Sequence, residues 1–155
     1  MAIRTRICDL LGIEHPIIGG AMYPCSNPEL VAAVSEAGGI GIIQPISLTY
    51  VHGAGGSFKD GLRAIRRLTD KPVGMNAIVE RSSQGYLDRM YRWVDQALEA
   101  DVSFFVTALG DPGEIVRRAH AAGAKVYHDV TERRFAEKAR DAGVDGFICV
   151  NARAG

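Results

Sequence analysis

Polar residues that can donate or accept hydrogen bonds follow short apolar runs at intervals along the chain. They are Gln44, Asn76, Thr107, the pair His128-Asp129 and Asn151, whereas the first run ends in Ala21-Met22. Amides, a hydroxyl and an imidazole that meet in one place suit a flat heterocycle with several carbonyl and ring-nitrogen positions. The alternative is that polar residues merely end the runs, as they often do, and the spacing leaves both interpretations open.

Other kinds of site lack their usual motifs. No GxGxxG follows the first apolar run, and the glycine-rich segment 53–57 is not followed by the Lys-Ser or Lys-Thr pair of a phosphate-binding loop. No two histidines have the spacing of metal ligands, so no metal is expected, and no Ser-His-Asp set is visible. Cys25 has no neighbouring base to activate it. His128 is the histidine best placed for chemistry, whereas His52 is expected at the surface and His120 is expected to be structural or solvated.

The apolar runs predict strands of a parallel sheet. They are nearly continuous in Ile, Val and Phe, which is typical of strands buried on both faces. Their ranges are 16–22, 39–45, 72–79, 102–109, 125–130 and 146–151. Amphipathic segments between them predict helices at 28–37, 58–68, 85–100, 112–122 and 132–142. Ligands of such sheets bind at the carboxyl ends of the strands, where the polar residues lie.

The predicted helices carry start and stop signals. Asn27 and Asp111 each precede a proline and an early glutamate, so each is expected to cap a helix, and Thr131 is expected to open the last helix. Three helices are expected to end at an Ala-Gly pair, with glycine in the left-handed conformation. Repeated βα units form either an open doubly wound sheet or a closed (β/α)8 barrel. Six strands suit the open sheet by count, because a barrel needs two more units.

The composition is that of an ordinary soluble globular protein. The chain has 155 residues, of which 47% are hydrophobic and 23% charged, and this length suits one domain, 1–155. Eighteen basic and eighteen acidic residues cancel, so neither nucleic acid nor an anionic membrane is expected as a partner. Three cysteines without a CxxC pair are expected to be reduced, and no stretch resembles a signal peptide or membrane helix. A cytoplasmic location is expected.

Several sequence blocks resemble one family. In chain order they are residues 5–18 (TRICDLLGIEHPII) with 20–22, residues 30–41, residues 69–76, and residues 142–146 leading to 154–155. Together they resemble the nitronate monooxygenases, formerly called 2-nitropropane dioxygenases. Relatives with similar sequence blocks include NADH:quinone reductases and flavin-dependent enoyl-ACP reductases. The resemblance implies an α/β fold, a parallel (β/α)8 TIM barrel that binds FMN. This chain would cover about six of its strands and five helices and would be incomplete at the C-terminus.

The resemblance also implies five flavin-contacting residues at the strand ends, namely Ala21, Met22, Asn76, His128 and Asp129. Asn76 would hydrogen-bond the flavin ring, and the last two would lie near the ribityl chain or the phosphate. The family's catalytic histidine would lie just beyond Gly155, as would the flavin phosphate site, so no catalytic residue is assigned within the chain. Some relatives have lysine at the position of Asp129, and this departure puts the substrate in doubt rather than the flavin.

Three functions follow as hypotheses. The first is an FMN-dependent oxidoreductase that oxidises alkyl nitronates with oxygen to a carbonyl compound and nitrite. The second is an NAD(P)H-dependent quinone or enoyl-ACP reductase on the same scaffold. The third is a truncated, non-catalytic binding module, which the early end of the chain would allow. A small-molecule substrate is expected as the partner, and the formation of a homo-oligomer is left open.

Overall fold

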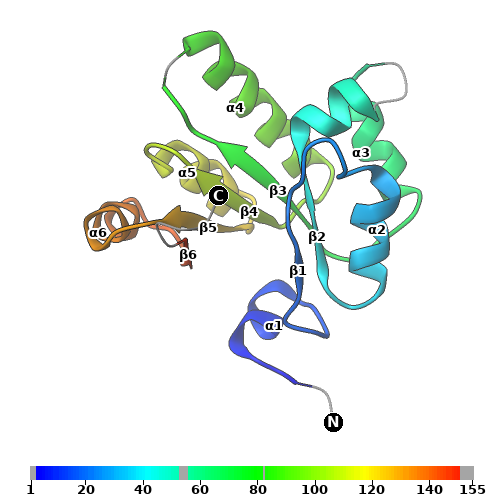
Figure 1. The fold of residues 1–155 in the computed structure, drawn as a ribbon, viewed down its shortest axis with the longest axis horizontal. Helices are drawn as coiled ribbons and strands as arrows, with labels where there is room; N and C mark the ends of the chain where they lie inside the picture. The colour runs from blue at the N-terminus through cyan, green and yellow to red at the C-terminus, as the bar shows by residue number, and fades with distance from the viewer. Residues whose placement is uncertain (1–2, 53–55, 82, 151–155) are drawn as a thin grey trace.

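The computed structural model describes residues 3–52, 56–81 and 83–150 (Figure 1). Its strands are β1 (Ile18–Gly19), β2 (Ile40–Ile43), β3 (Val73–Ile78), β4 (Phe104–Ala108), β5 (Lys125–Val130) and β6 (Gly146–Cys149). Its helices are α1 (Arg6–Leu11), α2 (Pro28–Glu36), α3 (Phe58–Arg66), α4 (Gln84–Glu99), α5 (Gly113–Ala121) and α6 (Arg133–Asp141), with a π-helical segment, η1 (Ser47–Val51), after β2. Within these described ranges, no helix is long and apolar enough to cross a membrane.

The order of the strands decides between the two predicted architectures. Neighbours in the sheet are neighbours in the chain, from β1 to β6, and every pairing is parallel. A doubly wound sheet would reverse its order at a switch point and carry helices on both faces. Here the strands advance in one direction and the sheet curls, with helices along its outer side (Figure 1). The fold is therefore of the TIM-barrel type. The number of strands alone could not show this, because the two architectures differ in the order of the strands.

Two apolar cores lie on the two faces of the sheet. The outer core joins the helices to the sheet and contains Met75, Phe105 and Val126 from the strands. The inner core lies within the curl and contains Phe104 and Val106 together with Cys8, Leu11 and Ile13 from α1 and the turn after it. Helix α1, near the start of β1 in Figure 1, therefore packs on the inside of the curl.

Several predicted helix signals are confirmed. The Asn27 side chain accepts a hydrogen bond from the Leu30 N–H at 2.7 Å, and Pro28 occupies the first position of α2. Glycines after α2, α5 and α6 adopt the left-handed conformation: Gly38 (φ 88°), Gly123 (φ 76°) and Gly143 (φ 89°). These residues set where each helix ends and the chain turns back toward the sheet.

Two predicted N-caps are each wrong by one residue. Helix α5 begins at Gly113 with Pro112 in the N-cap position, and the Asp111 carboxylate accepts from the Gly113 N–H at 2.9 Å in the turn before the helix. Helix α6 begins at Arg133 with Glu132 in the N-cap position, and no side chain caps it. Thr131 lies one residue too early for its hydroxyl to cap the first free N–H groups.

The sequence patterns did not predict two of the helices, and they overestimated the length of one strand. They predicted no helix at α1 or at η1, and they predicted a strand over 16–22 where the structure has only Ile18 and Gly19. These two residues pair with Ile40 and Gly41 of β2, and beyond them the chain leaves the ladder. An apolar run therefore indicates burial here without indicating how many residues find a strand partner.

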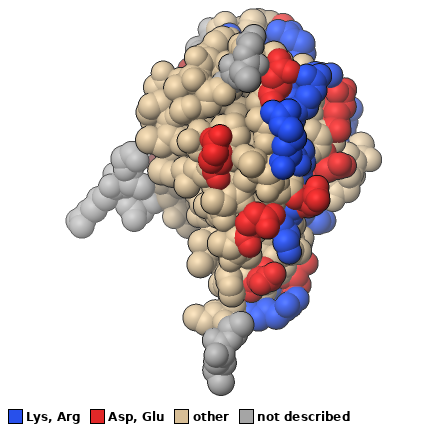
Figure 2. Space-filling view, turned by 90° about the vertical axis from the view of Figure 1, so that its right-hand side faces the viewer, with Lys and Arg blue, Asp and Glu red and all other residues tan. Residues whose placement is uncertain are grey.

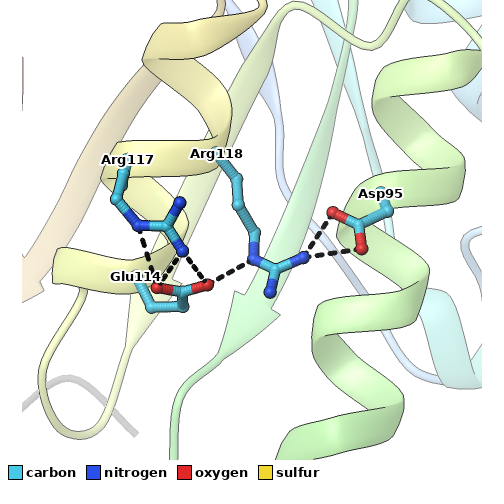
Figure 3. A network of polar contacts seen from close by, with 4 residues as sticks. All are labelled: Asp95, Glu114, Arg117 and Arg118. Carbon is cyan, nitrogen blue, oxygen red and sulfur yellow. Dashed lines mark hydrogen bonds and ion pairs between the residues drawn. The ribbon is translucent and has the colours of Figure 1, made fainter.

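Ion pairs join the outer helices α4 and α5 (Figure 3). The Arg118 guanidinium lies 2.7 and 2.6 Å from the two carboxylate oxygens of Asp95 on α4, and its Nε donates to Glu114 at 2.7 Å. Glu114 also accepts from Arg117, so one carboxylate holds two guanidinium groups. Figure 2 shows the side covered by α2 and α3, where charged residues gather in a band and much of the remaining surface is uncharged.

Candidate functional site

Strand periodicity separates the polar residues at the carboxyl ends into two sets. Successive side chains of a strand point to opposite faces. On β3, Met75 and Ala77 belong to the outer core, so Asn76 between them faces the inside of the curl. Asn76 is half-buried, and its side-chain amide has no hydrogen-bond partner among the residues that the structure describes. It is therefore free to donate to and accept from a ligand inside the curl.

His128 and Asp129 are adjacent on β5 and consequently face opposite ways. Val126 belongs to the outer core and Tyr127 packs against the inner core, so His128 faces the helices and Asp129 faces the inside. Thr107 of β4 shares the outer face, and its Oγ1 lies 2.8 Å from His128 Nδ1. The sequence grouped all of these side chains at one mouth. The structure brings Asp129 to the face of Asn76 and separates Thr107 and His128 from them.

Burial changes the pKa of both β5 residues. It lowers the pKa of the His128 imidazole, an effect that the nearby Asp111 charge opposes, and it raises the pKa of the Asp129 carboxyl. In the described part of the chain, Asp129 Oδ1 is buried without a hydrogen-bond partner. A buried carboxyl group with an unpaired oxygen is a common feature of ligand sites, because the missing partner can come from the ligand.

At the end of β1, the side chains are more available to a ligand than the backbone groups are. Ala21 packs against the inner core, whereas the Met22 side chain is 47% exposed. The Met22 N–H donates to Ser26 Oγ at 2.9 Å, and the Ser26 N–H donates to the Met22 carbonyl at 2.9 Å. Met22 can therefore offer a ligand its thioether side chain, while its N–H is already paired. A side chain at Gly20 would meet no atom within 4 Å, so open space adjoins the backbone there.

The segment after β2 was missed in the sequence, although a signal for it exists. Gln44 precedes Pro45, and its Oε1 accepts from the Ile46 N–H at 2.8 Å where the helical turn leading to η1 begins. Proline at a first helical position is a usual start signal. His52, which follows η1, contacts the Pro24 carbonyl through Nε2 and so ties the loops after β1 and β2 together.

A hollow of about 1060 Å³ lies at the carboxyl ends of β4 and β5, between the N-terminus of α5 and one side of α6. His128 and Asp129 both line it, since it spans the edge of the sheet. Its other lining residues are mainly small or apolar and include Ala108, Leu109, Pro112, Phe135 and Val150. The last predicted strand-end residue, Asn151, and the catalytic histidine expected beyond Gly155 lie outside the described residues. The flavin-binding roles of Ala21, Met22, Asn76, His128 and Asp129 therefore stay predictions.

The chain is similar to known proteins in both sequence and fold. Residues 4–155 match the family described as nitronate monooxygenase. A nitronate monooxygenase of Pseudomonas aeruginosa is 39% identical over 90 residues, which are 58% of this chain and 24% of the relative. A (3aS,4S,5R,7aS)-5-hydroxy-7a-methyl-1-oxo-octahydro-1H-indene-4-carboxyl-CoA dehydrogenase of Rhodococcus jostii is 28% identical over 99% of this chain and 40% of its own.

The solved structure of FabK from Thermotoga maritima is 34% identical, with a TM-score of 0.77 over 96% of this chain and 44% of that one. The chain thus spans less than half the length of each of these relatives. The family match nevertheless extends over nearly all of its residues. The chain therefore belongs to the nitronate monooxygenase family.

Proposed function

We propose that this protein is an FMN-dependent oxidoreductase whose flavin ring binds at the inner, carboxyl-end face of the sheet. The observation that carries the proposal is a pair of polar side chains on that face, the half-buried Asn76 amide and the Asp129 carboxyl with its buried Oδ1, neither of which has a hydrogen-bond partner among the residues described, in a chain of the nitronate monooxygenase family. Ligands of TIM barrels bind at this end of the strands, so the position and the chemistry agree.

The residues present fit a flavin. An isoalloxazine edge presents carbonyl oxygens, ring nitrogens and one N–H, and the amide of Asn76 can donate and accept at the same time. Burial raises the pKa of the Asp129 carboxyl, and its buried Oδ1, which has no partner among the described residues, can accept a hydrogen bond from the ring N–H. Open space beside Gly20 would allow a flat ring to approach the backbone of the first strand. When bound, FMN supplies electron transfer that protein side chains do not.

The chain itself would bind and orient the ring and keep water from its inner side. Asn76 and Asp129 would fix the orientation of the ring through hydrogen bonds. Phe104 and Val106, which are buried in the inner core, form an apolar floor beneath the mouth. Tyr127 packs edge-on against Phe104, with 5.2 Å between ring centroids, which closes the floor on the β5 side. Such a floor would exclude water and strengthen the hydrogen bonds above it.

The substrate proposed first is an alkyl nitronate, which would be oxidised with oxygen to a carbonyl compound and nitrite. Its support is the family match together with the nitronate monooxygenase relative. The second candidate is a reductase or dehydrogenase that passes a hydride between a nicotinamide and a carbon substrate. That candidate is supported by the relative named as a carboxyl-CoA dehydrogenase, which is 28% identical and aligns with 99% of this chain. Coverage does not separate the candidates, because a probable nitronate monooxygenase of Staphylococcus aureus is 27% identical and aligns with 98%.

An anaerobic stopped-flow comparison separates the candidates. The FMN-loaded protein is mixed with propyl-2-nitronate or with NADH, and the loss of flavin absorbance is followed. The first candidate predicts rapid loss with the nitronate and, on admission of oxygen, release of nitrite. Rapid loss with NADH and none with the nitronate would favour the reductase. If neither compound reduces a fully bound flavin, both enzyme proposals fail, as the binding-module hypothesis requires.

A further inference from the structure

The hydrogen bonds of Thr107 determine which nitrogen of His128 carries the proton. Thr107 Oγ1 lies 3.1 Å from the Tyr127 carbonyl, to which it donates, and 2.8 Å from His128 Nδ1. A hydroxyl group has one proton to donate. With that proton on the Tyr127 carbonyl, the contact to His128 is a hydrogen bond only if Nδ1 carries a proton and donates it to Oγ1. Both contacts are satisfied in this tautomer, and in a neutral ring it leaves Nε2 unprotonated.

The free nitrogen of His128 belongs to a nearly buried ring. The residue is 5% exposed, and within residues 3–52, 56–81 and 83–150 Nε2 has no hydrogen-bond partner. Burial lowers the pKa of the imidazole and so favours the neutral ring. Because Nδ1 is turned toward β4 and the ring lines the hollow between α5 and α6, Nε2 is the polar atom that the ring can present there.

The hollow suits a neutral ligand with a large apolar part. Leu109, Phe135 and Val150 are among its walls, and its volume of about 1060 Å³ accommodates a molecule of two or three fused rings. Its basic residues do not make it an anion site. Arg81 lies 3.5 Å from Asp111, and Lys138 shares the lining with Asp129 and Asp141, so carboxylates outnumber basic groups.

We propose that the hollow is a binding site for a neutral, mainly apolar molecule bearing a hydroxyl group, and that His128 Nε2 accepts the hydrogen bond of this hydroxyl. Thr107 is the positioning residue, because its hydroxyl fixes the tautomer that makes Nε2 an acceptor. The hollow adjoins the flavin-binding face, because Asp129 lines it as well, but His128 enters it from the opposite, outer face of β5. The proposal does not depend on the nature of the oxidoreductase reaction.

Two probes that share one ring system test the proposal. The affinity of the purified protein for 2-naphthol is compared by calorimetry with its affinity for 2-methoxynaphthalene, which has the same rings and no donor. One net hydrogen bond corresponds to roughly a tenfold preference for 2-naphthol. His128→Phe should abolish the preference, and His128→Gln, which offers an amide oxygen, should restore part of it. His120→Gln, which changes a histidine bound to Asp145 outside the hollow, should keep the full preference.

A second measurement does not require a variant of His128 to fold. Long-range ¹H–¹⁵N spectra of the native protein should show His128 with a protonated Nδ1 and an unprotonated Nε2, and Thr107→Val should produce a mixture of tautomers. A native His128 with the proton on Nε2 would overturn the proposal. So would equal binding of the two probes, the absence of binding by either, or a preference that survives in His128→Phe.

Discussion

The segment of the sheet from β3 to β6 has two halves that differ in packing, although all four strands were predicted to be buried on both faces. Strands β3 and β4 are buried on both faces along most of their length, between the inner core and helices α4 and α5. Strands β5 and β6 alternate between more and less buried residues, and α6 buries only Ala139 among its side chains. The tightly packed half therefore supplies the stability of the fold. The looser half keeps His128 and Asp129 next to a hollow, where a ligand can reach them.

Equal substitutions in the two halves should give the largest contrast. Phe105 of β4 is fully buried in the outer core, whereas Phe147 of β6 is 38% exposed, although both face the outer side. Phe105→Ala should lower the free energy of unfolding by roughly 3–5 kcal/mol, because it leaves a cavity in a packed core. Phe147→Ala should lower it by about 1 kcal/mol. Urea denaturation measures both, and equal losses would mean that the two halves are packed alike.

A smaller contrast is expected from the ion pairs. Arg118 bridges α4 and α5 through Asp95 and Glu114, whereas Arg133 pairs with Glu137 within α6 and is almost fully exposed. Arg118→Met should destabilise the protein by about 1–2 kcal/mol, since Asp95 loses its guanidinium partner and Glu114 keeps only Arg117. Arg133→Met should cost less than about 0.5 kcal/mol. A double-mutant cycle of Arg118→Met with Asp95→Asn isolates the pair, and a coupling energy near zero would contradict the bridging role.

The smallest effects concern pH. At Asp145, burial acts to raise the pKa, but hydrogen bonds from His120, the Val126 N–H and Lys125 outweigh it, and the pKa lies below its ordinary value of 3.8. The stabilisation from Asp145 is therefore complete above that value and is lost as pH falls through the lowered pKa. Asp129 behaves oppositely, because its raised pKa means that its cost appears as pH rises from 3.8 through that pKa.

Unfolding free energies measured from about pH 3 to about pH 7 should separate these two aspartates. Asp145→Asn should remove part of the loss of stability in acid. Asp129→Asn should instead remove a loss that develops as pH rises. If Asp129→Asn has the pH dependence of the native protein, the Asp129 carboxyl is not held in the buried, unpaired state described above.

Sequence patterns predicted the elements better than they predicted the faces. The β3 run and the Asn27-Pro28 start of α2 were identified because each depends on local chemistry. The β1 strand was overestimated because its length depends on pairing with β2, which no local pattern encodes. The faces of His128 and Asp129 could have been predicted, because residues adjacent on a strand face opposite ways. Both nevertheless line the hollow at the strand end, and their flavin-binding roles stay predictions.

Titration of the purified protein with FMN tests the central claim most directly, namely that Asn76 binds the flavin ring on the inner face. The quenching of flavin fluorescence gives the dissociation constant of the native protein and of Asn76→Ala. Asn27→Ala, which removes an exposed helix cap outside the curl, serves as the matched control. A lost hydrogen bond to a buried ring should weaken FMN binding in Asn76→Ala by about 1–3 kcal/mol, or roughly fivefold to 150-fold, while Asn27→Ala binds as the native protein does. Equal FMN affinity in the native protein and Asn76→Ala would contradict the assignment.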